Sequence, residues 1–353
     1  MTLATALATG PAPQPQLAEL AVHRAMEQAG VGRANGVLLF LSPHFTSLAD
    51  ASVRAAARAS RCLQIMGGFA HGLFTAHDWA LDRPAAAAMI LADQAGLGPV
   101  DAAASLIHIG GAAHLPTPLQ HKPRFGLFHP SAPTWYQGRL GADAQAQCGF
   151  RGLSTCCELS SGLELLSPDL QVSGVAEREL LSLGGTPAAL SLLRALPPAL
   201  RQPDNLPLHL VCLLRPDPGL DTATALARGA FTPLSLLLDH PDQSLSLSDT
   251  VQPGETLAWA IRLPKGAERD MGAALTRLRA RQPGRPAAGL MLSCLGRGPY
   301  FYGGEDRDLA VWRDHFPGVP LLGAYGSGQI APVGSGCRQW HNAVVTVTFH
   351  EES

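Results

Sequence analysis

Lysine is nearly missing from this chain, because only Lys122 and Lys265 stand among its 26 basic residues. Charged residues make up 15% of the sequence, the formal net charge is −2, and no basic patch stands out, which argues against nucleic acid as a partner. No apolar run approaches the roughly 20 residues that a membrane span needs. The amino terminus lacks a basic segment before its first apolar stretch, so we expect no secretory signal, no membrane partner and a cytoplasmic location.

Motifs for metals and cofactors are also lacking. The seven cysteines are an odd number without a framework spacing, which indicates reduced and mostly buried thiols. No CxxC pair, HExxH helix, GxSxG elbow or GxxxxGK[ST] phosphate loop occurs, and the GAYGSGQ stretch is not a dinucleotide fingerprint. His108, His114 and His121 lack the spacing of metal ligands. We therefore expect neither a metal nor a cofactor.

Apolar residues are plentiful at 46%, enough for a sizeable core, and 353 residues suggest two domains or one large one. Helical spacing predicts helices over residues 17–30, 47–60, 187–200 and 270–281, and short apolar runs predict strands at 36–42, 63–66, 208–214, 288–294 and 342–349. The apolar run at 85–92 is a strand candidate that is ambiguous with a helix. The sequence VQPG at 251–254 predicts a hairpin between strands at 244–248 and 256–263. The polar stretch 202–205 is the best linker, which divides the chain into residues 1–201 and 206–353.

The two ends of the chain share an order of elements. A buried strand, a helix, a strand ending in a glycine turn and a further strand occur in the first hundred residues and again in the last hundred. This order predicts mixed α/β layers, with mixed sheets covered by helices and an internal duplication whose two glycine turns face a shared cleft. The plainer interpretation is that alternating α/β segments always look somewhat alike.

The densest group of candidate site residues follows the strand at 288–294. Cys294 is followed by Gly296, Arg297 and Gly298, so that a thiol and a forked guanidinium stand beside backbone that can approach a ligand closely. Arg297 suits a carboxylate or phosphate, or else it pins its own loop by binding backbone carbonyls or Glu305. Cys294 is either a small buried side chain or a nucleophile with His341 or another histidine as its base.

A second glycine turn carries Gly323, Tyr325, Gly326 and Gly328, where the tyrosine offers a ring face and a hydroxyl to a small molecule. In the amino-terminal half, three further residues are placed like pocket residues: His44 follows the first buried strand, and Gly68 and His71 lie in the first glycine turn. The alternatives are turn packing for the glycines and a solvated loop for each histidine.

The carboxy-terminal segment SCLGRG…E…HFPGVPLLGAYGSGQIAP…H resembles the second half of a FIST domain. The matching positions are Cys294, Gly296, Arg297, Gly298, Glu305, Phe316, Pro317, Pro320, Leu321, Gly323, Tyr325, Gly328, Ile330, Pro332 and His341. The first half resembles the family through the strand GVLLFLS, Gly67, Gly68 and Gly72, so residues 1–201 and 206–353 correspond to the amino-terminal and carboxy-terminal FIST domains. Gln329 departs from the family, which has a glutamate there.

The resemblance implies an intracellular sensory domain that binds small ligands such as amino acids or related carboxylates in signal transduction. It implies a ligand site built from Arg297, Tyr325, Gln329 and the glycine turns. Because no kinase, cyclase or methyl-accepting segment is left over, such a protein is expected to signal through a separate output protein. Two alternatives remain: an enzyme using Cys294, and a structural or partner-binding module without a ligand.

Overall fold

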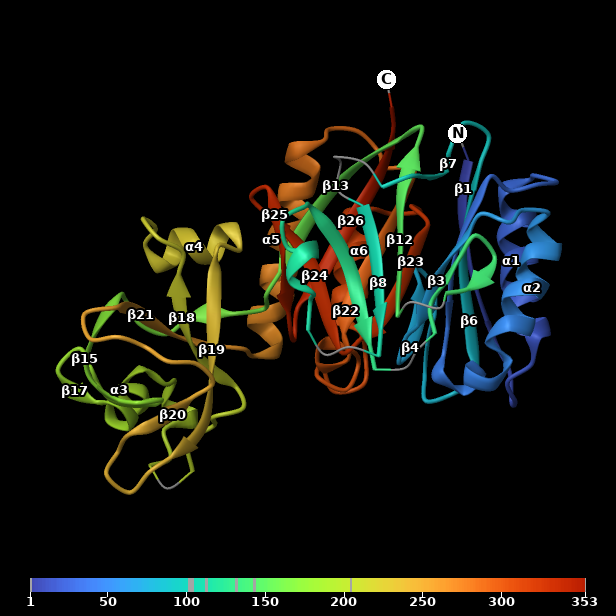
Figure 1. The fold of residues 1–353 in the computed structure, drawn as a ribbon. Helices are drawn as coiled ribbons and strands as arrows, with labels where there is room; N and C mark the ends of the chain where they lie inside the picture. The colour runs from blue at the N-terminus through green and yellow to red at the C-terminus, as the bar shows by residue number, and fades with distance from the viewer. Residues whose placement is uncertain are drawn as a thin grey trace. The chain divides into compact units, whose positions relative to one another are not determined.

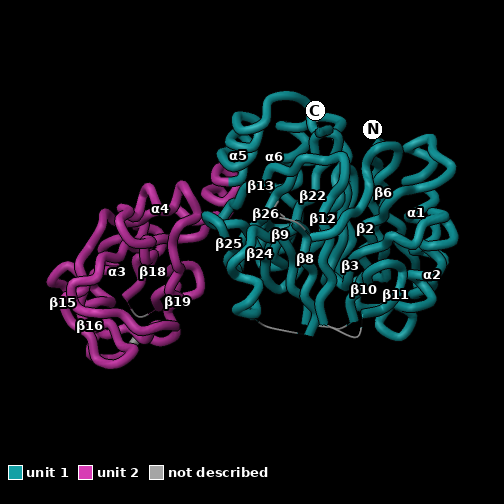
Figure 2. The backbone as a smooth tube through the Cα atoms, turned by 45° about the horizontal axis from the view of Figure 1, so that its top comes forward, with its two compact units in different colours: residues 1–161, 271–353 teal, residues 162–270 magenta. Residues whose placement is uncertain are grey.

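The computed structural model describes residues 2–100, 105–111, 114–130, 133–141, 144–203 and 205–352 (Figure 1). The chain packs into two compact units: unit 1 comprises residues 1–161 and 271–353, and unit 2 comprises residues 162–270 (Figure 2). Unit 2 is therefore an insertion in the sequence of unit 1. The linker expected at 202–205 falls inside unit 2 and includes Asp204, outside the described residues. The two sequence halves remain a prediction, distinct from this division by packing.

The first sheet of unit 1 has the strand order β1-β6-β2-β3-β10-β11. Its elements are β1 (Thr2–Thr9), α1 (Pro15–Ala29), β2 (Gly36–Leu41), α2 (Ala49–Ser60), β3 (Ile65–Phe69), β6 (Ala85–Ala92), β10 (Trp135–Tyr136) and β11 (Arg139–Leu140), with a 3-10 turn at Pro43–Leu48. Helix α1 begins with a proline in its first turn and ends at Gly30, whose φ of 66° is left-handed.

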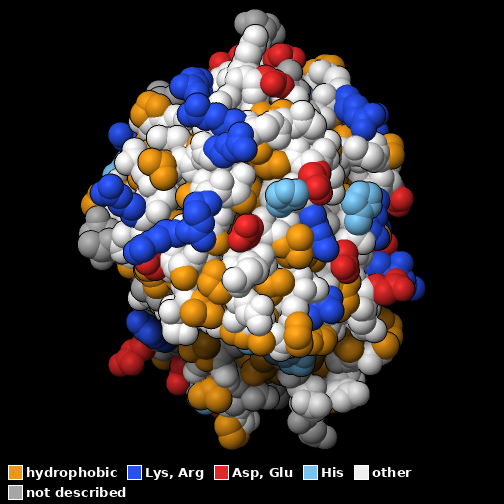
Figure 3. Space-filling view, turned by 90° about the vertical axis from the view of Figure 1, so that its right-hand side faces the viewer, with side chains coloured by type: hydrophobic (Ala, Val, Ile, Leu, Met, Phe, Trp, Pro, Cys, Tyr) orange, Lys and Arg blue, Asp and Glu red, His pale blue; other side chains and the backbone are white. Residues whose placement is uncertain are grey.

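Helices α1 and α2 cover one face of this sheet, side by side (Figure 1). Alanines on both helices pack with Val37, Leu39 and Leu41 of β2 in one apolar core. Since side chains alternate along a strand, Leu38 and Phe40 point to the opposite face. On the outer surface over these helices, apolar side chains are scattered among charged ones, and basic side chains gather toward one side (Figure 3).

The second sheet of unit 1 has the order β13-β26-β22-β23-β4-β5. Its elements are β4 (Gly72–Thr75), β5 (Trp79–Leu81), β13 (Leu153–Ser160), α5 (Pro264–Arg281), β22 (Ala288–Cys294), a 3-10 turn (Leu295–Arg297), α6 (Arg307–His315), β23 (Leu321–Gly326) and β26 (Val344–Glu351). Met271, Leu275 and Leu278 of α5 and Leu309 and Trp312 of α6 pack into one core with strand residues of this sheet. The predicted α/β layers are confirmed in both sheets.

The first two sheets repeat one topology. In the first, β1 pairs antiparallel with β6, β6 antiparallel with β2, and β2 parallel with β3. In the second, β13 pairs antiparallel with β26, β26 antiparallel with β22, and β22 parallel with β23. Helices α2 and α6 occupy equivalent places in the two series. The match supports the internal duplication, which stays a prediction because a shared topology does not by itself establish a shared origin.

The third sheet of unit 1 has the order β25-β24-β9-β8-β12-β7. Its strands are β7 (Gly96–Gly98), β8 (Ser105–Gly110), β9 (Arg124–His129), β12 (Gln145–Arg151), β24 (Gly328–Val333) and β25 (Gly336–Trp340), and a 3-10 turn covers Thr117–Leu119. One face of this sheet contributes Ile107, Ile109, Phe128 and Ile330 to an apolar cluster. The opposite face carries the polar side chains on which the candidate site depends.

Unit 2 is a closed arrangement of strands. Its order is β14-β21-β15-β16-β20-β19-β18, and β18 also pairs with β21, which completes a ring of six strands. Its elements are β14 (Glu164–Leu165), β15 (Leu170–Ala176), β16 (Glu179–Leu183), β17 (Thr186–Pro187), α3 (Ala188–Ala195), a 3-10 turn (Pro198–Leu200), β18 (Val211–Pro216), α4 (Thr222–Arg228), β19 (Phe231–Asp239), β20 (Leu245–Leu247) and β21 (Thr256–Ile261). Trp259, wholly buried, is its largest core side chain.

The predicted hairpin at 251–254 is wrong. Strand β20 pairs with β19 and β16, and β21 pairs with β14, β15 and β18. The chain reverses earlier, where His240 and Ser244 are joined by a backbone hydrogen bond of 3.1 Å. Because the chain reverses there, β20 pairs with the preceding strand β19. The VQPG segment then leads into β21, which does not pair with β20 and has β14, β15 and β18 as its partners.

Candidate functional site

The two glycine turns of unit 1 meet. The His71 amide, after β3, donates a hydrogen bond of 2.8 Å to the Tyr325 carbonyl, at the end of β23. After His71 the chain leaves the first sheet and continues as β4, which pairs antiparallel with β23 in the second sheet, while the chain beyond β23 enters the third sheet as β24. The ends of β3 and β23, which are far apart in the sequence, thus form one junction of three sheets.

Arg297 is buried in an internal ion pair. Its side chain is 0% exposed, and its Nη2 and Nε donate to the Asp308 carboxylate at 2.8 and 3.2 Å. The Tyr302 hydroxyl donates to the same carboxylate at 2.8 Å. Arg297 therefore pins its loop to helix α6, as in the structural alternative, but its partner is Asp308. Glu305, the partner considered from the sequence, has an 82% exposed side chain.

Asp306 is the residue that caps α6. Its Oδ1 accepts the Leu309 amide at 2.9 Å, and its Oδ2 accepts the Tyr325 hydroxyl. Burial raises the pKa of both carboxyls, to about 6 for Asp308, against the opposing effect of Arg297. Burial also raises the pKa of the Tyr325 hydroxyl well above its ordinary value, so the phenol is neutral and donates. The ring of Tyr325 packs against Phe74 with a centroid distance of 4.7 Å.

Cys294 and His341 have separate partners. The Cys294 Sγ, on a residue only 6% exposed, lies 3.9 Å from Asn342 Oδ1. The His341 ring is exposed, with Nδ1 3.1 Å from the Ser327 carbonyl and Nε2 3.0 Å from Gln339 Nε2. Among the hydrogen bonds described for this part of the chain, none joins the thiol to the imidazole. The Cys294 thiol and the His341 ring are thus not placed as a hydrogen-bonded pair.

The glycines of these two turns, and the two glycines beside Arg297, have neighbouring protein groups at short range. A Cβ on Gly68 would lie 2.1 Å from the His108 ring, one on Gly323 would lie 1.9 Å from the Phe74 ring, and one on Gly326 would lie 2.4 Å from Leu127. A Cβ on Gly296 would meet Asn342 at 2.3 Å, one on Gly298 would lie 3.2 Å from the Tyr325 ring, and one on Gly328 would lie 3.2 Å from the His341 ring. Close backbone approach was expected here, and side chains of the same chain make it.

Two of these close contacts lead to a row of side chains across the third sheet. His108 on β8 lies opposite Leu127 on β9, and Leu127 lies opposite Gln329 on β24. Residues directly opposite each other on neighbouring strands point to the same face of a sheet. This row (His108, Leu127 and Gln329) therefore faces the first two sheets, where Gly68 lies against His108 and Gly326 against Leu127.

The polar members of the row are buried without hydrogen-bond partners. Gln329 and His108 are both 0% exposed. Within the described residues, neither the amide oxygen nor the amide nitrogen of Gln329 has a hydrogen-bond partner, and neither ring nitrogen of His108 has one. An unsatisfied buried polar group costs about 1–3 kcal/mol, so four such atoms on one face are a substantial cost. Buried polar groups of this kind are normally satisfied, by protein, water or ligand.

Two further histidines extend this polar face. His129 lies two residues beyond Leu127 on β9, hence on the same face, and its ring centroid is 4.5 Å from that of half-buried His71. Burial, with a contribution from His129, lowers the pKa of His108 to about 3, and burial lowers the pKa of His71. His108 is thus neutral near pH 7, and it can both donate and accept a hydrogen bond.

The structure brings together Gly68, His71, Tyr325, Gly326 and Gln329 at or beside this junction. Cys294, Gly296 and His341 lie nearer to the Asn342 loop, and Arg297 belongs to the α6 network. His44 is exposed, with its Nδ1 3.2 Å from Ser42 Oγ.

Sequence reasoning missed the most informative contributors to the site: His108, His129, Asp306, Asp308 and Asn342. His108 was weighed only as a metal ligand, and the pairing that aligns it with Gln329 joins residues more than two hundred positions apart. The available signal was a histidine in an otherwise apolar strand, SLIHIG, which predicts a buried polar side chain.

Two further observations on the described residues concern metal-binding clusters and membrane-spanning helices. No group of three or more His, Cys, Asp or Glu side chains there could hold a metal ion. None of the helices within the described ranges has the length and hydropathy to cross a bilayer.

Comparison with known proteins finds a family match over part of the chain. The FIST C domain family model matches residues 189–332. An uncharacterized protein of Mycobacterium bovis is 34% identical over 110 residues, covering 31% of this chain and 28% of the relative. An uncharacterized protein of Mycobacterium tuberculosis is 32% identical over 106 residues, covering 30% and 26%. The chain thus spans under a third of the length of these curated relatives. Residues 189–332 match the FIST C domain, so this part of the chain is similar to the FIST family.

Proposed function

We propose that this protein is a sensory protein that binds a small polar ligand at the junction of its three sheets in unit 1. The observation that carries the proposal is the buried amide of Gln329, which has no hydrogen-bond partner within the described residues. A FIST C domain is a domain of sensory type, and Gln329 lies inside the matched range.

The chemistry of the junction supports a small polar ligand with both hydrogen-bond donors and acceptors. Gln329 and His108 are neutral, and each offers both a donor and an acceptor. The guanidinium of Arg297 is engaged by Asp308, so the ligand's carboxylate is not expected to pair with it. A small amino acid or related carboxylate would instead hydrogen-bond to the Gln329 amide and the imidazoles. Glutamine in place of the family's glutamate removes the negative charge that would have met an ammonium group.

Signal output follows from binding in this proposal. A ligand held between sheets ties β8 and β24 to the ends of β3 and β23, and it thereby rigidifies unit 1. A separate output protein in the cytoplasm would respond to that change. The alternative of a module without a ligand predicts that the polar row is satisfied by ordered water alone.

A stability screen tests the proposal. The wild-type protein is heated with each of the amino acids and with a panel of small carboxylates and amides, and unfolding is followed by tryptophan fluorescence. A ligand at 100 times its Kd stabilises the folded state by about 2.7 kcal/mol. We expect at least one compound to raise the unfolding temperature of the wild type and not that of Gln329→Leu. A compound that stabilises both equally binds elsewhere, and a panel without any stabilising compound contradicts the proposal.

A further inference from the structure

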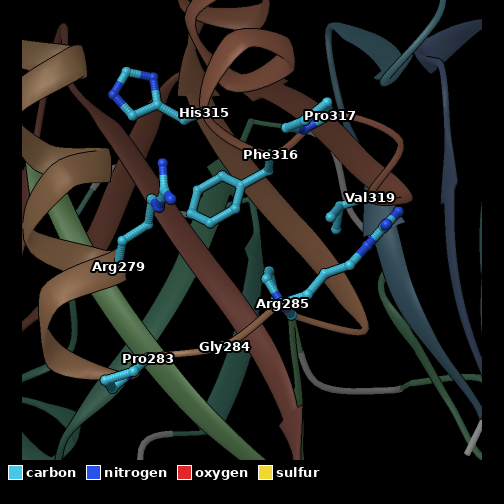
Figure 4. A pocket seen from close by; sticks show the side chains of 9 residues that line it. Arg279, Pro283, Gly284, Arg285, His315, Phe316, Pro317 and Val319 are labelled. Carbon is cyan, nitrogen blue, oxygen red and sulfur yellow. The ribbon is translucent and has the colours of Figure 1, made fainter.

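A pocket in unit 1 lies apart from the polar row. It has a volume of about 440 Å³ and is formed where α5 ends, where α6 ends, and by the loops that follow these two helices (Figure 4). Its size falls in the range of small-molecule sites. The pocket lies within the FIST C domain, but none of the residues predicted from the sequence to bind a ligand line it.

The lining combines an apolar floor with basic side chains. Phe316 and Val319 form part of the floor and are 6% and 2% exposed. Arg279 lies on one side of the Phe316 ring and Arg285 on the side of Val319, with His315 near Arg279 (Figure 4). Among the described residues that line the pocket, none is acidic.

Two of the basic side chains are positioned by the protein. Arg285 donates from Nη2 to the Gly318 carbonyl at 2.9 Å, which holds it across the loop before β23. His315 Nδ1 lies 2.9 Å from the Val311 carbonyl of its own helix. The Phe316 ring is fixed in turn by Trp312, with a centroid distance of 4.6 Å. The floor and two of its basic neighbours are therefore preorganised, which reduces the entropy lost on binding.

Helix dipoles explain the positions of two of the three basic residues without any ligand. Basic residues are favoured in the last turn of a helix because the carboxy-terminal end carries partial negative charge, and Arg279 and His315 both lie in such turns. The dipole does not explain Arg285, which lies in a loop, or the pocket with an aromatic floor between the two arginines. A guanidinium beside an apolar floor suits an anion on a flat apolar body.

We propose that this pocket binds a small organic anion, a carboxylate carried on a flat aromatic body. The aromatic body lies on Phe316, the carboxylate pairs with Arg279, and Arg285 adds positive charge on the other side of the floor. This site is independent of the junction where the polar row lies, so either can exist without the other.

The test uses the full chain and naphthalene-2-carboxylate as the probe, with binding followed by calorimetry and ligand-detected NMR. We expect Arg279→Gln to weaken binding by about fivefold or more, since it removes a charge-assisted hydrogen bond at a partly exposed site. Naphthalene-2-carboxamide, which keeps the ring and loses the charge, should be weakened similarly. Arg228→Gln is the matched control, because Arg228 is an exposed arginine in the last turn of α4.

The outcomes separate clearly. Binding that is weakened by Arg279→Gln and unchanged by Arg228→Gln supports the anion site. Equal weakening in both variants shows general electrostatic attraction and overturns it. Absence of binding at millimolar probe, or binding of the carboxamide as tight as that of the carboxylate, also overturns it.

Discussion

Replacing Gln329 with leucine is predicted to stabilise the protein in the absence of ligand. Gln329 is 0% exposed, and its two amide atoms lack hydrogen-bond partners within the described residues. Each unsatisfied group costs about 1–3 kcal/mol, and leucine removes both while filling similar space. Two such groups cost about 2–6 kcal/mol together. Allowing about 1 kcal/mol for imperfect packing of the branched side chain, we expect the free energy of unfolding to rise by about 1–5 kcal/mol.

The matched control is the same substitution at Gln339, on the adjacent strand β25. The Oε1 of Gln339 accepts the Leu115 amide at 2.9 Å, so Gln339→Leu removes a made hydrogen bond and should lower stability by about 1 kcal/mol. Urea denaturation followed by circular dichroism and fluorescence measures both variants. The two substitutions are expected to change stability in opposite directions. A loss of 1 kcal/mol or more in Gln329→Leu would refute the reasoning, because it would show that the amide is satisfied in solution.

Three further predictions concern the surrounding framework. In the wild type, the folded pKa of His108 is about 3 and lies below the ordinary 6.5, so between these pH values the unfolded state binds one more proton and the free energy of unfolding falls by about 1.4 kcal/mol per pH unit on acidification. His108→Phe should remove this contribution and flatten the acid side of the stability curve, which urea denaturation at pH 5, 6 and 7 measures. Asp308→Ala should cost about 3–5 kcal/mol by leaving the buried Arg297 charge without its carboxylate, a loss seen in chemical denaturation at pH 7. Gly323→Ala should cost about 1–3 kcal/mol, read from its thermal unfolding, because its Cβ would lie 1.9 Å from the Phe74 ring.

Each of these predictions has a control on the same protein. His23→Phe replaces an exposed histidine and should leave the acid-side slope of the free energy of unfolding against pH unchanged. Asp314→Ala, at an exposed position of α6, is the control for Asp308→Ala and should hardly change the free energy of unfolding. Gly32→Ala is the control for Gly323→Ala and should also be nearly neutral, because no atom lies within 4 Å of the new Cβ. An unchanged acid slope in His108→Phe would contradict its burial as a neutral base. A neutral Asp308→Ala would contradict the buried ion pair, and a neutral Gly323→Ala would contradict the close packing.

The elements with strong apolar periodicity could be predicted from the sequence. Helix α1, strands β2, β6 and β22, and the shared order of the two ends are all present as expected. Strand β1 was missed because its sequence, TLATALAT, is mostly alanine and threonine and lacks a clear apolar alternation. Helix α5 begins at Pro264, six residues before its predicted start, because its first turns are polar.

The site was harder to predict because its contacts depend on register and burial. The sequence drew attention to Gly68, His71 and Gln329, and the structure places them around one junction. The role of Arg297 depends on its partner, the Asp308 carboxylate eleven residues later. The local sequence of an arginine between glycines does not predict which carboxylate it pairs with. The alignment of His108 with Gln329 requires the strand order of the third sheet, which local pattern does not determine.

The central claim is that the buried amide of Gln329 meets a ligand. The most direct measurement is calorimetric titration of the wild type, Gln329→Leu and Gln339→Leu with the compound that stabilises the wild type most. We predict that Gln329→Leu loses binding by about tenfold or more, as expected when a buried hydrogen-bonding partner is removed, and that Gln339→Leu retains it. Equal affinity of the wild type and Gln329→Leu would contradict the account.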